Sequence, residues 1–270
     1  MKICAVGGDG RIPFALASLE ARGHEVSHTA YGGPLSAEVL GAAEAVLLPY
    51  PATRDGLTLN APTSPLPLPL SSLFPMLPDG APVLCGRITD ALRAAAKEHH
   101  LYDYETDERF LLKNAAITAE GALSLAMQRL ASPLCDTPTL VLGSGRLARA
   151  LADLLLGLHV PVTVAARNPN APLPGGLRPI PLGALPAELP RFALILNTVP
   201  VPLLSGRLLS RATQGLLLIE LSSAPEVVDT DACRELGIEV VSAPGLPGKY
   251  APKGAGEALA EAVDSILTSL

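Results

Sequence analysis

Aromatic side chains are scarce in this sequence of 270 residues. It has no tryptophan, five tyrosines and four phenylalanines, so it offers few rings on which nucleic-acid bases could stack. The formal net charge of −6 gives no general attraction for nucleic acids or for anionic lipids. We therefore expect no nucleic-acid partner.

Clustered cysteines and long apolar runs are also missing. Cys4, Cys85, Cys135 and Cys233 form no C-x-x-C pair, and a metal site needs clustered ligands. No apolar stretch reaches about 18 residues without a proline, a glycine or a charge, and the N-terminal apolar run is too short for a signal peptide. These absences predict a cytoplasmic protein with reduced thiols, no metal and no membrane span.

The residues that are present favour two α/β domains. Hydrophobic residues make up 49% of the chain and charged residues 17%, which is ample material for two cores of about 130 residues each. Apolar runs alternate with segments of helical period, as in βαβ units with a parallel sheet. The expected strands are 2–6, 25–29, 45–49, 83–86, 139–142, 161–165, 193–197, 216–221 and 239–242, and the main expected helices are 13–22, 90–99, 114–130, 149–156 and 254–270.

These elements predict two Rossmann-like, doubly wound parallel-sheet domains around a hinge cleft. Residues 1–117 would form a substrate domain, with the helix at 254–270 packing back on it, and residues 118–253 would form an NAD(P)-binding domain that includes the hinge helix. Between 49 and 82 the chain is rich in proline. Proline fixes φ and removes a backbone donor, so we expect an extended surface loop there.

A glycine turn follows the expected strand at 139–142. The segment reads G-x-G-x-x-A and leads into a helix: Gly143, Ser144, Gly145, Arg146, Leu147 and Ala148. In a dinucleotide site the first glycine permits the tight turn, the second lets the main chain approach the pyrophosphate, and the last position keeps the helix close to the sheet. The N–H groups of the helix N-terminus then attract the anion. We expect a dinucleotide here; the alternative is an ordinary strand-to-helix turn.

The choice of dinucleotide is read at the end of the next strand. NAD sites usually place a carboxylate about 20 residues after the glycines to bind the ribose 2′-hydroxyl, but here the chain continues with Arg167 and Asn168. An arginine can pair with a 2′-phosphate. The pattern predicts NADP(H), with NAD as the alternative, unless Arg167 is only a solvated charge.

Other strand ends should join this site, because ligands lie outside the carboxyl ends of parallel strands. We expect contacts with the cofactor from Asn197, Thr198 and Val199, and from Ser222 within the segment 220–225. The loop from 243 to 250, which contains Pro244, should lie near the nicotinamide, although its glycines and prolines also suit a plain turn.

A second glycine-rich turn lies near the N-terminus. Gly7, Gly8 and Gly10 surround Asp9, but their spacing is not that of a dinucleotide turn. We expect this domain to bind substrate instead. Arg11 suits a substrate carboxylate, and the alternative is a charge at the surface of a helix start.

Several motifs resemble, from end to end, the family of dipicolinate synthase A subunits of spore-forming bacteria. They are Gly7-Gly8-Asp9-Gly10-Arg11, Arg54-Asp55-Gly56, Tyr104-Glu105 with Glu108, Asn114-Ala115 with Thr118-Ala119-Glu120-Gly121, Asn197-Thr198-Val199-Pro200 and Ala243 to Lys253. The resemblance implies an architecture like that of D-2-hydroxyacid dehydrogenases. It also implies that the protein, with the flavoprotein-like B subunit of dipicolinate synthase, oxidises dihydrodipicolinate from the lysine pathway to dipicolinate in the mother cell during sporulation.

That reaction would transfer a hydride to NADP⁺ and a ring proton to a base, so the enzyme needs mainly positioning and a modest base. For the two substrate carboxylates the candidates are Arg11, Arg54 and Lys253, with Asn114 and Thr118 as polar partners. Asn114 and Thr118 share a helix face at i and i+4. Glu120 or Glu105 would be the base, although Glu120 also suits a solvated helix start.

Two other functions stay open from the sequence. A D-2-hydroxyacid dehydrogenase needs an imidazole for the hydroxyl proton, and no histidine follows His159, which disfavours it. A cofactor-binding regulatory protein without turnover is the second alternative. The substrate species and the oligomeric state, including a homo-oligomer, are also open.

Overall fold

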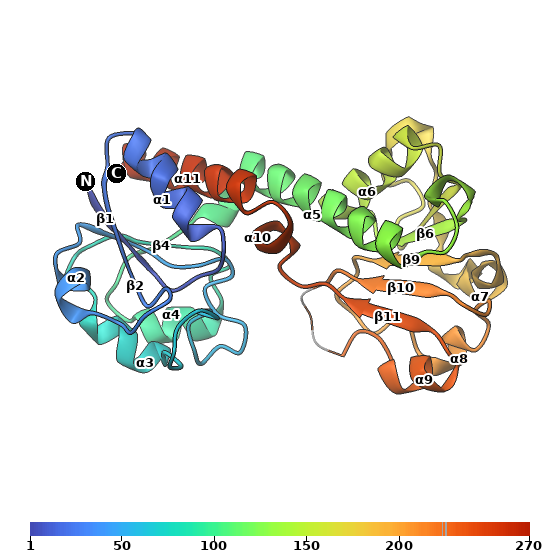
Figure 1. The fold of residues 1–270 in the computed structure, drawn as a ribbon, viewed down its shortest axis with the longest axis horizontal. Helices are drawn as coiled ribbons and strands as arrows, with labels where there is room; N and C mark the ends of the chain where they lie inside the picture. The colour runs from blue at the N-terminus through green and yellow to red at the C-terminus, as the bar shows by residue number, and fades with distance from the viewer. Residues whose placement is uncertain (223, 225) are drawn as a thin grey trace. The chain divides into compact units, whose positions relative to one another are not determined.

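The computed structural model describes residues 1–222, 224 and 226–270. They divide into two compact units (Figure 1). The first comprises Met1–Asn114 and Pro247–Leu270, and the second comprises Ala115–Leu246. Each unit is built around its own parallel sheet.

The sheet of the first unit has five parallel strands. They are β1 (Lys2–Val6), β2 (Glu25–Thr29), β3 (Ala45–Leu47), β4 (Val83–Cys85) and β5 (Leu101–Asp103), in the order β2-β1-β3-β4-β5. Because β1 has β2 on one side and β3 on the other, the connections after β1 and β3 run in opposite directions. Such a switch point opens a crevice at the carboxyl ends of the two strands.

Helices cover both faces of this sheet. On one face lie α1 (Ile12–Ala21), α11 (Pro252–Ser269) and the start of α5 (Glu108–Arg129); on the other lie α2 (Ala37–Gly41), α3 (Leu70–Leu73) and α4 (Asp90–Ala96). Helices α1 and α11 lie side by side (Figure 1). A Cβ at Gly256 of α11 would lie only 2.5 Å from the carbonyl oxygen of Arg11. The C-terminal helix thus closes the core of the N-terminal sheet.

The sheet of the second unit has six parallel strands. They are β6 (Thr139–Leu142), β7 (Val162–Ala166), β8 (Ile180–Pro181), β9 (Leu194–Asn197), β10 (Leu217–Glu220) and β11 (Glu239–Ser242), in the order β11-β10-β9-β6-β7-β8. This is the strand order of dinucleotide-binding Rossmann domains, with its switch point between β6 and β9.

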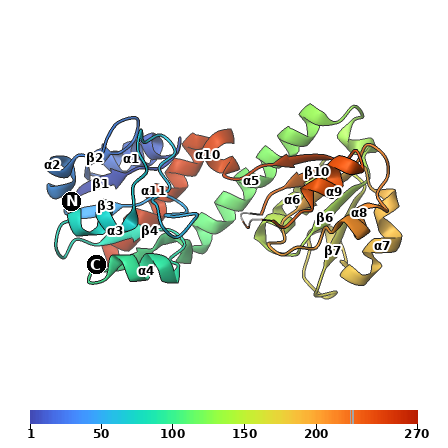
Figure 2. The ribbon, with the colours of Figure 1, turned by 90° about the horizontal axis from the view of Figure 1, so that it is seen from below.

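Helices again cover both faces of the second sheet (Figure 2). The main part of α5 and α6 (Arg146–Gly157) lie on one face, while α7 (Leu185–Glu188), α8 (Gly206–Leu209) and α9 (Thr230–Glu235) lie on the other. The short α10 (Leu246–Tyr250) follows β11. Single 3-10 turns occupy Phe74–Met76, Tyr104–Thr106, Leu134–Asp136, Pro174–Gly176, Leu182–Ala184 and Leu189–Arg191.

The fold class expected from the sequence is confirmed, and each expected strand is present to within two residues at its ends. The strands β5 and β8 were missed: β8 has only two residues, and β5, which is as short as β3 and β4, is half-buried and lacks their continuous apolar run. None of the helices among the described residues is long and apolar enough to cross a lipid bilayer.

The prediction of an unbroken extended loop over 49–82 was wrong for its last third. Helix α3 and the 3-10 turn Phe74–Met76 bury Leu70, Leu73 and Phe74. The closely spaced prolines all precede Leu70, and Pro75 sits in the first turn of its helix, where the missing N–H costs nothing. The extended loop therefore covers only the segment with closely spaced prolines, and helical structure begins where that segment stops.

Several helix boundaries were also wrong: the helix expected at 90–99 ends at Ala96, and the helix expected at 149–156 begins at Arg146. The helix expected from 114 begins at Glu108, because the Asp107 carboxylate accepts the Arg109 N–H at 2.8 Å and starts the helix before the apolar stripe. The loop expected over 243–250 contains α10, which begins at Leu246.

Candidate functional site

The glycine turn after β6 is shaped by Gly143. Its φ is +109°, and a Cβ there would lie 2.5 Å from the Thr198 hydroxyl oxygen. Its N–H donates to the carbonyl oxygen of Ala165 at 2.8 Å. Only glycine suits such a backbone in so close a contact, so this residue is required by the fold itself.

Gly145 differs, because the protein does not require it to be a glycine. Its φ of −74° suits any residue, and a Cβ there would meet none of the described residues within 4 Å. Gly145 caps α6 without a side chain, and the first turn of α6 has no acidic residue. The first N–H groups of the helix and its positive dipole end therefore face open space, which suits an anion.

The other residues of the turn lie as a dinucleotide site needs them. Ser144 and Leu147 are half-buried and Arg146 is exposed, while Ala148 is fully buried and lets α6 pack closely on the sheet. The open space at Gly145 thus lies at the switch point of the sheet, between β6 and β9.

The end of β9 is tied to the glycine turn. The Thr198 hydroxyl and N–H both donate to the carbonyl oxygen of Leu142, at 2.6 and 3.2 Å. Asn197 is fully buried; its amide nitrogen donates to Glu220 and to the carbonyl oxygen of Val199, and its oxygen accepts the Val199 N–H. Asn197 therefore shapes the turn from behind.

Arg167 is exposed directly after β7 and its side chain makes no hydrogen bond or ion pair with any residue that the structure describes. The Asn168 side chain accepts the N–H of Asn170. Pro244 is half-buried just after β11. Arg167 is thus a free cation beside the strand that follows the glycine turn.

Ser222 donates its N–H to Glu220 at 2.7 Å, and its buried hydroxyl has no partner among residues 1–222, 224 and 226–270. Ser223 and Pro225, which belong to the same expected strand end, lie outside the described residues.

In the first unit the N-terminal glycine turn is filled by protein. A Cβ at Gly7 would lie 2.6 Å from the Cβ of Ala61, and one at Gly10 would lie 2.9 Å from the Gly248 carbonyl oxygen. The Gly8 N–H donates to the carbonyl oxygen of Asn60. These glycines admit neighbouring main chain rather than a phosphate, which agrees with their departure from the dinucleotide spacing.

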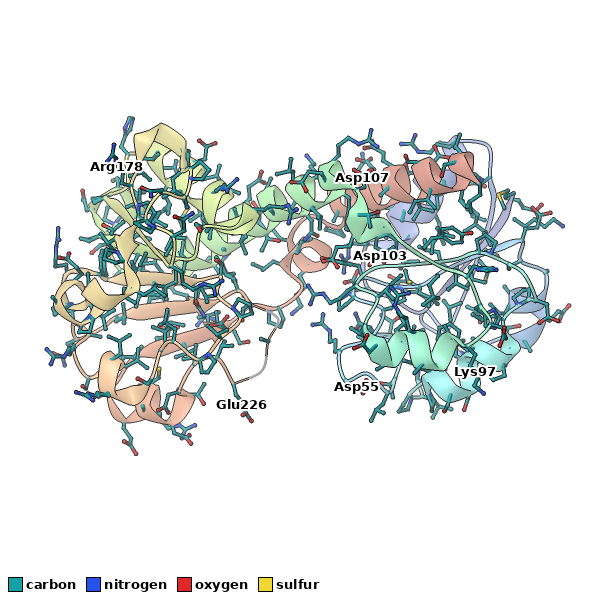
Figure 3. The ribbon with its side chains drawn as sticks, turned by 180° about the vertical axis from the view of Figure 1, so that it is seen from behind. Asp55, Lys97, Asp103, Asp107, Arg178 and Glu226 are labelled. Carbon is teal, nitrogen blue, oxygen red and sulfur yellow. The ribbon has the colours of Figure 1, made fainter. Side chains whose placement is uncertain are left out.

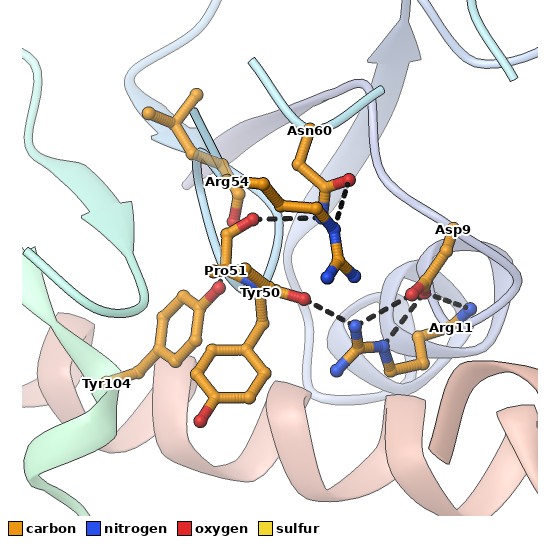
Figure 4. A network of polar contacts seen from close by, with 8 residues as sticks. Asp9, Arg11, Tyr50, Pro51, Arg54, Asn60 and Tyr104 are labelled. Atoms are coloured by element: carbon orange, nitrogen blue, oxygen red, sulfur yellow. Dashed lines mark hydrogen bonds and ion pairs between the residues drawn. The ribbon is translucent and has the colours of Figure 1, made fainter. Parts of the chain in front are cut away.

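Arg11 is buried, with only 4% of its surface exposed. Its Nε and Nη2 atoms donate to the two oxygens of Asp9 at 2.8 and 2.7 Å, and Nη2 also donates to the carbonyl oxygen of Tyr50 at 2.5 Å (Figure 4). Burial alone would raise the pKa of Asp9, but the hydrogen bonds and charge of Arg11 outweigh it and lower that pKa. The idea of Arg11 as a surface charge was therefore wrong.

Arg54 is the exposed cation of this cluster. Its Nε donates to the Asn60 side chain at 3.4 Å, and Asn60 in turn donates to the carbonyl oxygen of Pro51 (Figure 4). The charge of Arg54 also helps to lower the pKa of Asp9. Hydrogen bonds from Thr58 and Leu57 to Asp55 hold the loop and keep the pKa of Asp55 well below its usual range.

Tyr50 and Arg87 join Glu105 in a polar group that the sequence did not reveal. The Tyr50 hydroxyl donates to Glu105 Oε1 at 2.7 Å, and Arg87 Nη2 lies 3.8 Å from the same oxygen. Burial and the hydrogen bond to Glu105 raise the pKa of Tyr50 to about 12, so its hydroxyl stays protonated. Only the place of Tyr50 directly after a strand could have indicated it.

Asp103, at the end of β5 (Figure 3), aligns this group. Its carboxylate accepts the N–H groups of Glu105 at 2.8 Å, Arg87 at 3.3 Å and Ile88 at 3.1 Å. The group therefore collects residues from the carboxyl ends of β3, β4 and β5, at the same edge of the sheet as its switch point.

The remaining candidates lie on α5 and α11. Glu120 is exposed, whereas Thr118 is buried and Asn114 half-buried. Successive residues of a helix are 100° apart, so Glu120 lies about 200° around α5 from Thr118. Lys253 is exposed in the first turn of α11. Of the two candidate bases, Glu105 alone lies beside a cation and a phenol in the described contacts.

No three metal-ligating side chains gather anywhere in the part of the chain that the structure describes.

Known proteins resemble the chain in sequence and in fold. Residues 2–106 match the family model described as the N-terminal domain of the dipicolinate synthase A subunit. The dipicolinate synthase A subunit of Bacillus subtilis (strain 168) is 31% identical over 183 residues, which are 66% of this chain and 61% of the relative, so the match spans less than two thirds of the relative's length. The motif-based family resemblance is confirmed.

Solved structures extend the likeness to the whole fold. The dipicolinate synthase A subunit from Bacillus halodurans has a TM-score of 0.83 at 22% identity and covers 98% of this chain and 97% of its own. A D-lactate dehydrogenase from Treponema pallidum has a TM-score of 0.67 at 13% identity, covering 100% and 96%. The chain thus shares its two-domain fold with dipicolinate synthase A subunits and with a D-lactate dehydrogenase.

The pair of buried Arg11 and half-buried Asp9 makes a prediction about stability. Arg11→Met leaves the Asp9 carboxylate without its cation and its charge-assisted hydrogen bonds, which should lower the free energy of unfolding at pH 7 by about 1.5–3 kcal/mol. In the native protein the pKa of Asp9 lies below its ordinary value of 3.8. Its stabilisation is therefore present above that pH and is lost as the pH falls through the folded-state pKa. Urea unfolding should show that the stability difference between wild type and Arg11→Met is constant from pH 7 to pH 4 and narrows as the pH falls further, below 3.8.

The matched control is Arg109→Met. Asp107 and Arg109 have the same Asp-x-Arg spacing and a similar two-point contact, but the Arg109 side chain is 77% exposed, so the loss should be small. Equal losses in both variants, or a difference that does not change with pH, would contradict the assignment.

Proposed function

We propose that the chain, whose residues 2–106 match the family model of the N-terminal domain of dipicolinate synthase A subunits, oxidises dihydrodipicolinate to dipicolinate. NADP⁺ would be the hydride acceptor, with NAD⁺ as the alternative. We assign the dinucleotide to the second unit and the cyclic dicarboxylate to the first. The protein would act in the mother cell during sporulation, together with the flavoprotein-like B subunit.

The observation that carries the proposal is the open space at Gly145. A glycine that the protein itself does not need stands at an uncapped helix N-terminus, at the switch point of a Rossmann sheet. The bare amides of this turn fit a pyrophosphate. Gly143 and Thr198 hold the turn, and Ser144, Arg146 and Leu147 line it.

Arg167 supports the choice of NADP⁺. It is an exposed cation without an internal partner among the described residues, placed where a carboxylate would otherwise bind the ribose hydroxyl. A 2′-phosphate would give it a charge-assisted pair.

In the first unit Arg54 is the residue that can receive a substrate carboxylate, because it is exposed while Arg11 is engaged by Asp9. Lys253 is a second exposed cation of that unit. Glu105 is the proposed base. Tyr50 donates to one of its oxygens and Arg87 lies nearby, so the carboxylate is held ready to accept a ring proton.

When bound, the nicotinamide supplies the site that accepts a hydride from a ring carbon of the substrate. The protein has to hold the reactants in place and to provide the base, since formation of the aromatic ring drives the reaction. The amides of the glycine turn orient the dinucleotide, Arg54 orients the ring through its carboxylate, and Glu105 takes the proton.

A D-2-hydroxyacid dehydrogenase is the less favoured enzyme, although it shares the fold. The second unit contains a single histidine, His159, just after α6. It precedes β7 and so lies at the edge where the parallel strands begin, whereas ligands bind at their carboxyl ends. That position does not suit the imidazole that this chemistry needs.

Gly145→Ala should weaken dinucleotide binding at least about tenfold without changing the melting temperature, because the new methyl group enters only the space left for the ligand. Gly143→Ala is the contrasting variant: its left-handed φ and its contact with Thr198 should lower the melting temperature. Calorimetric titration with NADP⁺ and thermal melts of both variants measure this. Unchanged affinity in Gly145→Ala would refute the site.

Arg167→Ala should weaken the binding of NADP⁺ about 10- to 150-fold and leave the affinity for NAD⁺ unchanged. This loss corresponds to one charge-assisted hydrogen bond of about 1.5–3 kcal/mol. Arg211→Ala serves as control, because Arg211 is also exposed but precedes β10 at the opposite edge of the same sheet. If wild-type protein binds the two dinucleotides equally well, the preference is wrong.

Turnover is tested by incubating the purified chain with enzymatically generated substrate and NADP⁺ or NAD⁺, in the presence and absence of the B subunit, while the absorbance of dipicolinate is followed. We expect product, and we expect Glu105→Gln to bind NADP⁺ normally while losing product formation. Product from the purified chain alone would exclude a purely regulatory role. Turnover of small 2-hydroxy acids in its place would favour the dehydrogenase.

A further inference from the structure

Glu220 is a buried carboxylate at the carboxyl end of β10 that dinucleotide binding as described above does not use. Only 7% of its surface is exposed. Its Oε2 atom accepts the amide N–H of Asn197 at 2.6 Å, and its Oε1 atom accepts the main-chain N–H of Ser222 at 2.7 Å. Both oxygens are therefore engaged as acceptors by neighbouring strand ends.

Asn197 connects Glu220 to the turn after β9. Its side-chain oxygen accepts the Val199 N–H at 3.1 Å, and its nitrogen also donates to the Val199 carbonyl oxygen at 3.3 Å. Because Asn197 is wholly buried, the contact with Glu220 decides which way its amide group faces. The 197–199 turn thus depends on the acid behind it.

The same turn touches the glycine turn. Thr198 makes two hydrogen bonds to the carbonyl oxygen of Leu142. Its hydroxyl oxygen lies only 2.5 Å from the position that a Cβ of Gly143 would take. The hydrogen bonds therefore run from β10 through β9 to the residue that opens the dinucleotide turn on β6.

We propose that Glu220 is a positioning residue for the dinucleotide: through Asn197 it holds the 197–199 turn against Gly143 and so keeps the amides after Gly143 aimed at the pyrophosphate. This rests on the proposed dinucleotide site. Glu220 itself touches no ligand, and its effect on binding is indirect.

The chemistry of this position calls for a side chain that accepts twice. Glu220 faces two N–H donors, and an ionised carboxylate is an acceptor at both oxygens. A glutamine of the same shape would turn one N–H group toward another donor and leave one buried bond unmade. The two turns would then lose their fixed spacing, although the core would stay packed.

The test compares Glu220→Gln with Asp229→Asn. Asp229 lies in the same unit and also accepts two main-chain N–H groups, from Gly206 at 3.1 Å and from Ala232 at 3.0 Å, but these belong to α8 and α9. Each variant thus loses a carboxylate that accepts twice. Calorimetric titrations with NADP⁺ and with NAD⁺ are made well below the melting temperature of each variant, so that only folded protein is compared.

We expect Glu220→Gln to weaken the binding of NADP⁺ and of NAD⁺ equally, each by about tenfold, which corresponds to the loss of one hydrogen bond. The ratio of the two affinities should not change, because Arg167 is not touched. The Asp229→Asn variant should bind both dinucleotides with wild-type affinity, even if its melting temperature falls as much as that of Glu220→Gln. Adding Asn197→Asp to Glu220→Gln exchanges donor and acceptor across the same contact, and this double variant should recover part of the lost affinity.

Equal affinity in Glu220→Gln and wild type overturns the positioning role and leaves the proposed function standing. So does an equal loss in Asp229→Asn, since the effect would then follow stability alone. If wild-type protein binds neither dinucleotide, the proposed function falls and this role falls with it.

Discussion

Two parallel sheets each have one place where neighbouring strands send their connections in opposite directions, and both sites depend on it. At β1 and β3 of the first unit, and at β6 and β9 of the second, the loops part and leave the carboxyl ends of the strands accessible. Helices cover the two faces of each sheet, so this edge is where polar groups can gather without breaking a core.

The two units use the same turn differently. Gly7 and Gly10 lie against Ala61 and Gly248, so in the first unit the protein's own loops fill the space beside the glycines. A Cβ added to Gly145 of the second unit would meet no residue within 4 Å in the part of the chain that the structure describes. A glycine turn is therefore a means of bringing main chain close to something, and the surrounding loops decide whether that is protein or ligand.

Charge in the first unit is arranged by burial. The buried Arg11 and the half-buried Asp9 neutralise each other through hydrogen bonds, because a charge that is removed from water needs a partner of opposite charge. Arg54 stays exposed and keeps its charge available. Tyr50 lies between these groups and Glu105, with Arg11 and Arg87 within 5.5 and 6.0 Å of its ring centre. The cluster thus presents a free cation and a supported carboxylate.

The sequence by itself determined every strand except β5 and β8, the fold class and the glycine turn at Gly143, because period and turn chemistry are local properties. It also indicated Arg167 as a candidate for binding the cofactor, because that prediction requires only that the residue directly follows a strand. Tertiary structure alone decided that Arg11 is buried against Asp9, that Glu120 faces away from Thr118, and that Tyr50 meets Glu105 from a distance of 55 residues. Contacts of that kind depend on which strand ends become neighbours. That order arises only when the sheet forms, and no spacing along the chain encodes it.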